Sequence, residues 1–311
     1  MGLLDWLRRA LAGGPAERAR RGERGRSRRP ARDTGLGLME LSRRLGLPVS
    51  DLQLAPVSYD EFRIPKRGGG ARTILAPNAK LKALQRRVLH RLLGRLKAHP
   101  AAMGFERGRS IVTHARLHAA PAVIVRMDVR EFFPSTEAHR VREYFRAIGW
   151  GSEAVMLLMK WCTWEGGLPQ GAPTSPRLSN LVNYRMDARL AGLAAALGAT
   201  YSRYADDLAF SFARDDRQTI TAAIRSTKLI LADYGYMLHL KRKLSIRRRH
   251  QRQAVTGLVV NDGVRLPRET RRLLRAARHR LAAGRPATLT PEQLAGWGAF
   301  LGMVERQAGS R

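Results

Sequence analysis

Leucine and valine recur at helical spacing between residues 81 and 96 of the chain. Leu81, Leu84, Val88, Leu92 and Leu96 fall on one face of a helix, and four arginines occupy the other faces. The pattern therefore predicts an amphipathic helix with a basic outer surface.

From Leu36 onward, the other hydrophobic patterns predict a mixture of strands and helices. Residues 122–127 form a short apolar strand that ends at Asp128, and residues 200–213 predict a strand, a turn at Asp206-Asp207 and a second strand. A hairpin is expected where Asn261-Asp262-Gly263 separates two apolar runs. Further helices are predicted over 141–148, 152–161, 175–190 (with Ser175 as N-cap and Pro176 at N1), 217–234, 268–283 and 291–308 (with a capping box that starts at Thr290). The result is an α+β fold, in which a small antiparallel sheet packs on helices and a mostly helical lobe follows.

Charge narrows the possible partners of this fold. The chain has 311 residues, with 57 Lys+Arg against 25 Asp+Glu, a formal net charge of +32. So much like charge repels itself unless a polyanion neutralises it, which favours nucleic acid; an anionic membrane surface is the alternative. The 44% of hydrophobic residues excludes a purely disordered basic tail.

The N-terminal segment differs in composition from the remainder. Residues 1–32 hold ten Arg and three acids, so we expect residues 1–35 to form a basic flexible arm. The arm either captures phosphates or acts only as a solvated tail.

Cysteine usage and hydropathy bear on location. Cys162 is the single cysteine, which excludes an intramolecular disulfide and a cysteine-based zinc site. No apolar run reaches membrane-spanning length, and charge interrupts the first nine residues too often for a signal peptide. We therefore expect a cytoplasmic protein that does not associate with membranes.

Three acids stand out in this basic chain. Asp128 ends an apolar strand, and Asp206 and Asp207 lie at the tip of the predicted strand pair. One Asp-Asp pair alone is ordinary turn chemistry, since Asp tolerates turn backbone conformations. Strands that pair can bring such acids together, and nucleotidyl transfer uses two Mg²⁺ ions held by carboxylates and substrate phosphates.

Three motifs in order resemble those of reverse transcriptases. Residues 127–133, from Asp128 to Phe133, resemble the first palm motif, Asp-x-x-x-x-aromatic. Pro169-Gln170-Gly171 resembles the Pro-Gln-Gly loop, and Tyr204-Ala205-Asp206-Asp207 resembles the Tyr-x-Asp-Asp box. The resemblance covers roughly residues 45–270 and implies an RNA-directed DNA polymerase, a nucleotidyltransferase with the right-hand fold of fingers, palm and mostly helical thumb.

The resemblance also implies roles for individual residues. Asp128, Asp206 and Asp207, with the backbone of Val129, would hold two Mg²⁺ ions. Lys66 and Arg72, on a glycine-tipped fingers hairpin, would hold the triphosphate of a dNTP. The remaining nucleotide-binding candidates are Phe133 beneath the sugar, Gln170 and Gly171 beside it, and Lys241 or Lys243 near the pyrophosphate.

Two further segments resemble the retron branch of the family. His114-Ala115-Arg116-Leu117-His118 matches its Asn-Ala-x-x-His motif, with His in place of Asn, and Val255-Thr256-Gly257 matches its Val-Thr-Gly motif. We therefore assign RNA binding to His114, His118, Val255, Thr256 and Gly257. Either segment could instead be ordinary packing: histidines on a helix, and a β-branched strand that ends at Gly.

Retron enzymes bind a structured noncoding RNA and copy part of it into single-stranded DNA. The branched product commonly serves anti-phage defence with an effector protein encoded nearby, so the resemblance implies these partners. It divides the chain into the arm (1–35), fingers and palm (36–254) and thumb (255–311). The alternatives are a non-retron bacterial reverse transcriptase, of intron or abortive-infection type, and a catalytically silent RNA-binding scaffold with a polymerase fold.

Overall fold

The computed structural model describes residues 35–65, 69–239 and 244–309. Its contacts divide the chain into two compact units, each assembled from three segments of the chain. Unit 1 contains Met1–Pro100, Val129–Leu190 and Arg225–Leu238; unit 2 contains Ala101–Asp128, Ala191–Ile224 and His239–Arg311. The expected basic arm, apart from Gly35, and the candidates Lys66, Lys241 and Lys243 lie outside the described residues.

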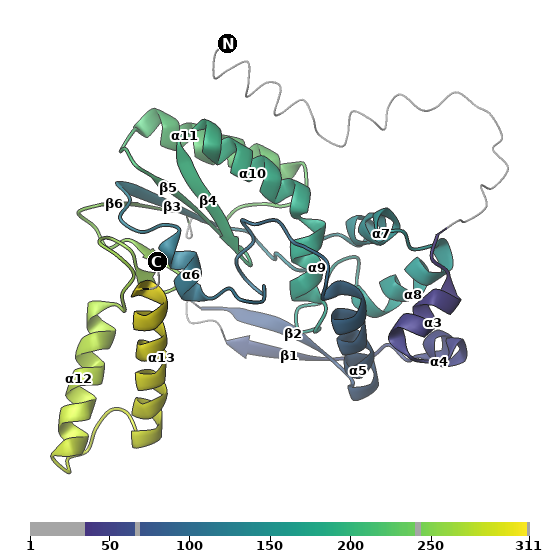
Figure 1. The fold of residues 1–311 in the computed structure, drawn as a ribbon, viewed down its shortest axis with the longest axis horizontal. Helices are drawn as coiled ribbons and strands as arrows, with labels where there is room; N and C mark the ends of the chain where they lie inside the picture. Colours follow the sequence, from purple (N-terminus) through teal and green to yellow (C-terminus); the bar gives the residue numbers. More distant parts are fainter. Residues whose placement is uncertain (1–34, 66–68, 240–243, 310–311) are drawn as a thin grey trace. The chain divides into compact units, whose positions relative to one another are not determined.

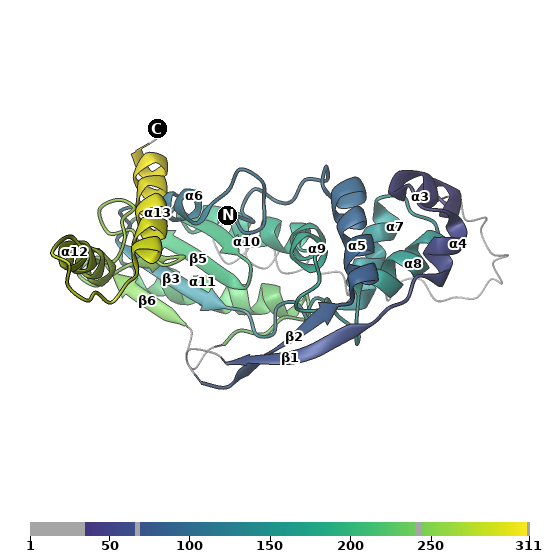
Figure 2. The same ribbon diagram turned by 90° about the horizontal axis from the view of Figure 1, so that it is seen from below.

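Unit 1 combines a two-stranded hairpin with a helical core. Strands β1 (Tyr59–Pro65) and β2 (Ala71–Pro77) pair antiparallel along their whole length, as the long ribbon in Figure 2 shows. The helices are α3 (Leu38–Leu45), α4 (Val49–Leu54), α5 (Ala79–Val88), η1 (Leu89–Leu93), α7 (Ala138–Ala147), α8 (Ser152–Cys162) and α9 (Ser175–Val182). The predicted apolar face is buried from Leu81 to Leu92 in the core of this unit, which confirms the helix. Its last turn, η1, is a π-helix that ends at Leu93, so the predicted position Leu96 lies beyond the helix and is partly buried.

The predicted helix over 175–190 is interrupted in the structure. Helix α9 ends at Val182, and α10 (Tyr184–Ala196) begins after Asn183. The side chain of Asn183 donates to the Tyr236 hydroxyl at 2.9 Å and accepts from Arg140 at 2.6 Å. The expected N-cap was also wrong: Thr174 holds that position, while Ser175 lies inside the helix and its hydroxyl donates to Pro169 O at 2.7 Å.

Unit 2 is built on a four-stranded antiparallel sheet of order β4-β5-β3-β6 (Figure 1). The strands are β4 (Ala199–Tyr204), β5 (Asp207–Phe212), β3 (Val123–Asp128) and β6 (Ser245–Arg248). Strand β3 lies between two partners and is buried at every position except Arg126, which explains why Val123–Val125 and Met127 are apolar. The short helix α6 (Ile111–Arg116) belongs to this unit, and α11 (Arg217–Ala232), like α10, has residues in both units.

The C-terminal part of unit 2 contains a short hairpin and two helices. Strands β7 (Ala254–Val255) and β8 (Leu258–Val259) pair around Thr256-Gly257, a turn that the sequence did not predict. The expected pairing across residues 261–263 is present only as isolated bridges. Helices α12 (Arg268–Ala282) and α13 (Pro291–Gly309) match the prediction and lie side by side in Figures 1 and 2.

The expected capping box of α13 is present. Gln293 N donates to the Thr290 hydroxyl at 3.3 Å, and Thr290 N donates to the Gln293 side chain at 3.1 Å. None of the helices that the structure describes is both long enough and apolar enough to cross a bilayer.

Candidate active site

Strand pairing brings the candidate acids together in unit 2. Strands β3 and β5 are antiparallel, and their register sets Asp128 directly opposite Asp207. Side chains that face each other in this way have Cβ atoms about 4.5–5.5 Å apart. Asp206 precedes β5 in the turn, so three acids that span residues 128 to 207 gather at one end of the sheet.

The turn that carries Asp206 is tight. Tyr204 pairs with Asp207, which leaves Ala205 and Asp206 as a two-residue loop between β4 and β5. Ala205 has φ 56°, a left-handed conformation that costs a non-glycine residue free energy. Such a turn holds Asp206 at a fixed position relative to the strand end.

Two basic side chains lie beside these acids. Arg126 Nη2 is 3.1 Å from Asp207 Oδ2, because residues two apart on a strand share a face and Arg126 stands two positions before Asp128. His239 Nε2 is 3.8 Å from Asp128 Oδ1, and His239 N donates to Asp128 O at 2.9 Å. Asp128 itself is only 7% exposed, so its carboxylate is held in a confined environment.

The donor set is compatible with a hard divalent cation. Within the described ranges, no three His, Cys, Asp or Glu side chains converge into a ready-made metal cage. Mg²⁺ does not need such a cage, since it binds through one or two carboxylates together with substrate phosphates. The facing carboxylates of Asp128 and Asp207, with Asp206 adjacent, fit that mode of binding.

In unit 1, the Pro-Gln-Gly loop lies against strand β2. Leu75 N donates to Gln170 O at 2.8 Å. Gly171 has φ 134°, and a Cβ at this position would come within 2.5 Å of Leu75 O. Residue 171 must therefore be glycine for two reasons. Its backbone conformation is one that other residues rarely adopt, and the backbone of β2 lies too close for a side chain.

Arg72 lies on the same strand as Leu75. It pairs with Ile64 of β1 and is exposed, so its guanidinium is accessible to an anion. Its expected partner in triphosphate binding, Lys66, is outside the described residues.

The two phenylalanines of the first palm motif have different environments. Phe132 is 4% exposed and stacks on Tyr236 at 5.5 Å between ring centroids. Phe133 is partly buried and packs at the edge of the unit 1 core. Val129, whose backbone is a candidate metal ligand, is 1% exposed and forms a bridge with Leu238.

The two candidate histidines lie inside unit 2. His114, on α6, and His118, just after it, are each 1% exposed, so neither imidazole has an open surface in this conformation. Both Nε2 atoms contact the Ser202 hydroxyl of β4, at 2.7 and 2.6 Å, and His118 Nδ1 is 2.8 Å from the Ser211 hydroxyl of β5. His114 also stacks on Tyr204, the first residue of the Tyr-x-Asp-Asp box, with ring centroids 5.5 Å apart.

The imidazoles of this histidine–serine cluster are neutral. The Ser202 hydroxyl has one hydrogen to donate and lone pairs that accept, so it can bond to both rings, with the direction of each bond set by the tautomers. Burial lowers the pKa of His118 to about 4, and burial together with the neighbouring charges of His118 and Arg126 lowers the pKa of His114 to about 3. The cluster is therefore uncharged at neutral pH.

The Val-Thr-Gly segment forms the β7–β8 turn. Val255 is 1% exposed in the core of this unit, and Thr256 Oγ1 donates to Ile111 O of α6 at 3.1 Å. Thr256 and Gly257 have φ 47° and 82°, the positive values that a two-residue I′ turn requires. Gly257 is exposed, so the turn tip is the part of this segment most open to a partner.

Comparison with known proteins now identifies the family. The family model for reverse transcriptase (RNA-dependent DNA polymerase) matches residues 64–255, more than half of the chain. The Retron Ec86 reverse transcriptase of Escherichia coli is 33% identical over 291 residues, which cover 90% of this chain and 89% of the relative. The chain belongs to the retron reverse transcriptases. This confirms the resemblance and the α+β right-hand polymerase fold that the motifs imply.

Two further retron reverse transcriptases are similar to this chain in sequence. The Mx162 enzyme of Myxococcus xanthus is 37% identical over 311 residues (86% of this chain), and the Mx65 enzyme of the same organism is 38% identical over 275 residues (81% of this chain). The chain spans only 64% and 63% of the lengths of these two relatives. Among solved structures, apo telomerase from Candida Tropicalis, truncated from the C-terminal domain, has a TM-score of 0.48 at 13% identity, over 69% of this chain and 55% of that one. Reverse transcriptase folds generally use divalent metal ions, as the donor set in unit 2 allows.

Sequence reasoning missed several side chains of this retron reverse transcriptase. Ser211 is a polar position within the largely apolar strand β5, a signal that could have indicated buried hydrogen bonding, whereas Ser202 lies in the mixed strand β4 and has no such contrast. Arg126 could have been found from its two-residue spacing to Asp128. For His239 the sequence offers no comparable signal, because backbone pairing at the Val129–Leu238 bridge, rather than a motif, brings it to Asp128.

Proposed function

We propose that the protein is an RNA-directed DNA polymerase whose reaction occurs at Asp128, Asp206 and Asp207. The observation that carries the proposal is the β3–β5 register, which sets two motif carboxylates opposite each other and the third in the adjoining turn. A scaffold without catalysis would have no need of three acids at one strand end in a chain of net charge +32.

The proposed metal ligands are the three carboxylates and the backbone carbonyl of Val129, with two Mg²⁺ ions as the cofactor. Bound there, the ions would supply activation of the primer hydroxyl and neutralisation of phosphate charge. The protein contributes the placement of the oxygen donors. The ion pair of Arg126 with Asp207 and the two-residue turn at Ala205 would position these groups before substrate arrives.

The same proposal assigns nucleotide binding to residues of unit 1. The exposed guanidinium of Arg72 is suited to bind phosphate oxygens in a bidentate manner. Gln170 and Gly171 would border the sugar, with Phe133 as the ring beneath it. Lys66, Lys241 and Lys243 remain predicted phosphate-binding cations.

The retron membership supports a more specific task. We infer that the enzyme copies part of a cognate structured noncoding RNA into single-stranded DNA, with residues 255–311 as the thumb, 36–254 as fingers and palm and 1–35 as a basic arm. RNA binding at Val255, Thr256 and Gly257 is supported by the exposed turn tip. For His114 and His118, burial favours a role in supporting the sheet, and direct RNA contact stays a prediction. The effector protein, a role in anti-phage defence and the cytoplasmic location also stay predictions.

Asp206→Asn tests the polymerase proposal. The substitution keeps the size of the side chain but removes a charged metal ligand, so DNA synthesis on a primed RNA template should fall by about 10²-fold or more. RNA binding and thermal unfolding should be nearly unchanged, since Asp206 occupies a turn.

The matched control is Asp51→Asn, at an exposed acid in the first turn of α4. It removes one negative charge from the chain at a distance from the motif residues in sequence and should synthesise DNA at the original rate. Extension by Asp206→Asn at the rate of the unsubstituted protein would overturn the metal assignment and favour the silent scaffold.

A further inference from the structure

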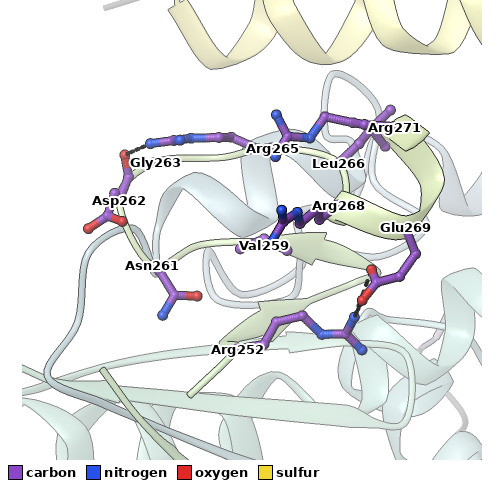
Figure 3. Close-up of a pocket in the computed structure, with 10 residues that line it drawn as sticks. All are labelled: Arg252, Val259, Asn261, Asp262, Gly263, Arg265, Leu266, Arg268, Glu269 and Arg271. Carbon is purple, nitrogen blue, oxygen red and sulfur yellow. Dashed lines mark hydrogen bonds and ion pairs between the residues drawn. The ribbon is translucent and has the colours of Figure 1, made fainter. Parts of the chain in front are cut away.

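A cavity of about 270 Å³ lies in the C-terminal part of unit 2, away from the motif acids in sequence. Arg252, Arg265, Arg268 and Arg271 line it, and we call it the arginine pocket (Figure 3). Arg252 lies in the loop before β7, and Arg265 lies in the loop after β8. Arg268 and Arg271 lie at the start of α12. These arginines lie outside the reverse transcriptase and retron motifs at residues 114–118, 127–133, 169–171, 204–207 and 255–257.

Two of the four arginines are held in place by neighbouring groups. Arg252 Nη1 donates to both carboxylate oxygens of Glu269, at 3.0 and 3.1 Å, and Arg265 Nη2 donates to Asp262 O at 3.0 Å; both contacts are drawn in Figure 3. Ordering these side chains before a ligand binds lowers the entropy that binding would cost.

The other two arginines are available to a ligand. The guanidinium groups of Arg268 and Arg271 are exposed and have no hydrogen-bond or ion-pair partner among the residues that the structure describes. Asp262 and Glu269 are the acids at the pocket, so four positive charges face two negative ones. The surplus, together with the fork geometry of guanidinium, favours a phosphate.

The pocket also has an apolar side. Leu266, 4% exposed, and the partly buried Val259 contribute to its lining. Its volume falls just below the usual range for small-molecule sites, roughly 300–1,000 Å³. Apolar lining, free guanidinium groups and limited volume suit one nucleotide better than a bare phosphate, because a guanidinium plane can stack on a base and aliphatic side chains can pack against it.

We propose that the arginine pocket binds one unpaired nucleotide of a single-stranded nucleic acid. Arg268 and Arg271 bind its phosphate, and the base rests on Val259 and Leu266. The proposal rests on the proposed function in so far as the protein handles nucleic acid, and it adds a site that accepts an unpaired strand and rejects a duplex, whose bases are stacked and unavailable.

The test is a binding measurement with the full-length chain, which needs no catalysis. Fluorescent single-stranded RNA, single-stranded DNA of the same sequence and the corresponding RNA duplex are titrated with the Arg268→Gln/Arg271→Gln variant. Affinity for at least one single strand should fall by about tenfold or more, while affinity for the duplex falls much less. The strand that loses more affinity identifies the source of the nucleotide.

Two variants control this measurement. Arg275→Gln/Arg278→Gln removes the same two charges, with the same spacing, further along α12 and outside the pocket lining. It should weaken single strands and duplex to the same small extent. Arg268→Lys/Arg271→Lys keeps the charge and folding but loses the fork geometry, so it should give an intermediate loss.

Equal losses for the two glutamine variants, or an equal loss for duplex and single strands, would overturn the pocket assignment. Those outcomes leave the polymerase proposal standing, because the Asp206→Asn assay measures DNA synthesis. Conversely, a protein that makes no DNA could still show the selective loss of single-strand binding.

Discussion

At the scale of single residues, the adjacent Phe132 and Phe133 differ in burial and in proposed role. Phe132 is buried and stacks on Tyr236, whose hydroxyl contacts Thr136 Oγ1 at 2.7 Å and accepts from Asn183 at 2.9 Å. Phe133 is only partly buried. The polar network beneath Phe132 fixes the backbone from which Phe133 projects, so Phe132 supports the fold and Phe133 remains the candidate for sugar discrimination.

Phe133→Ala should admit ribonucleotides. A ring beneath the sugar leaves no room for a 2′-hydroxyl, and the overpacking cost of about 1–3 kcal/mol corresponds to roughly 5–150-fold discrimination. The preference for dNTP over rNTP in kcat/KM, measured on a primed RNA template, should therefore fall by about that factor. An unchanged preference in a folded variant would show that the sugar is read elsewhere.

Phe132→Ala is the control for this residue. It removes a fully packed ring and should destabilise the protein by about 3–5 kcal/mol without a selective gain in rNTP use. A gain equal to that of Phe133→Ala would contradict the division of roles.

At the scale of elements, helix α6 supports the strand pair that carries Asp206 and Asp207. The histidine–serine cluster joins α6 to both β4 and β5, and His114 stacks on Tyr204 just before the turn. Hydrogen bonds of two buried, neutral imidazoles thus connect three elements.

The cluster should make stability depend on pH. Because the folded pKa of His118, about 4, lies below its unfolded value of 6.5, its contribution to stability is complete above pH 6.5 and is lost as the pH falls toward 4. The loss is on the order of 3 kcal/mol. Unfolding by denaturant, measured across this pH window, should show a shallower pH dependence for His118→Asn than for the unsubstituted protein.

His279→Asn, at an exposed histidine of α12, should keep the original pH dependence. Parallel curves for His118→Asn and the unsubstituted protein would mean that His118 is not buried as a neutral group.

At the scale of the whole molecule, the positive net charge favours nonspecific binding to polyanions. A formal charge of +32 attracts any polyanion, and contacts with phosphates give affinity without sequence information. On our proposal, selection of one RNA would therefore depend on local features, such as the β7–β8 turn with its exposed Gly257 and the arginine pocket.

Binding to a short RNA duplex of arbitrary sequence should depend steeply on salt. With 6–10 phosphates neutralised, affinity should fall by roughly 10³–10⁵ between about 50 and 200 mM salt, which a fluorescence titration measures. A change of less than about tenfold would mean that few of the cations contact phosphate.

The local parts of this protein could be predicted from the sequence alone. The helical faces, the apolar strand that ends at Asp128 and the order of the three motifs depend on periodicity and residue type within short windows. The net charge needs no structure either. These features were sufficient for the family, the fold class and the identity of the candidate acids.

Tertiary structure decided which of these parts meet. The register that sets Asp128 opposite Asp207, the ion pair of Asp207 with Arg126 and the burial of His114 and His118 depend on packing between segments far apart in the chain. The close approach of Gly171 to Leu75 is of the same kind. Periodicity predicts which side chains of a strand point to the core, but it does not predict which strand pairs with it. Strand pairing depends on the burial of apolar surface from the whole unit.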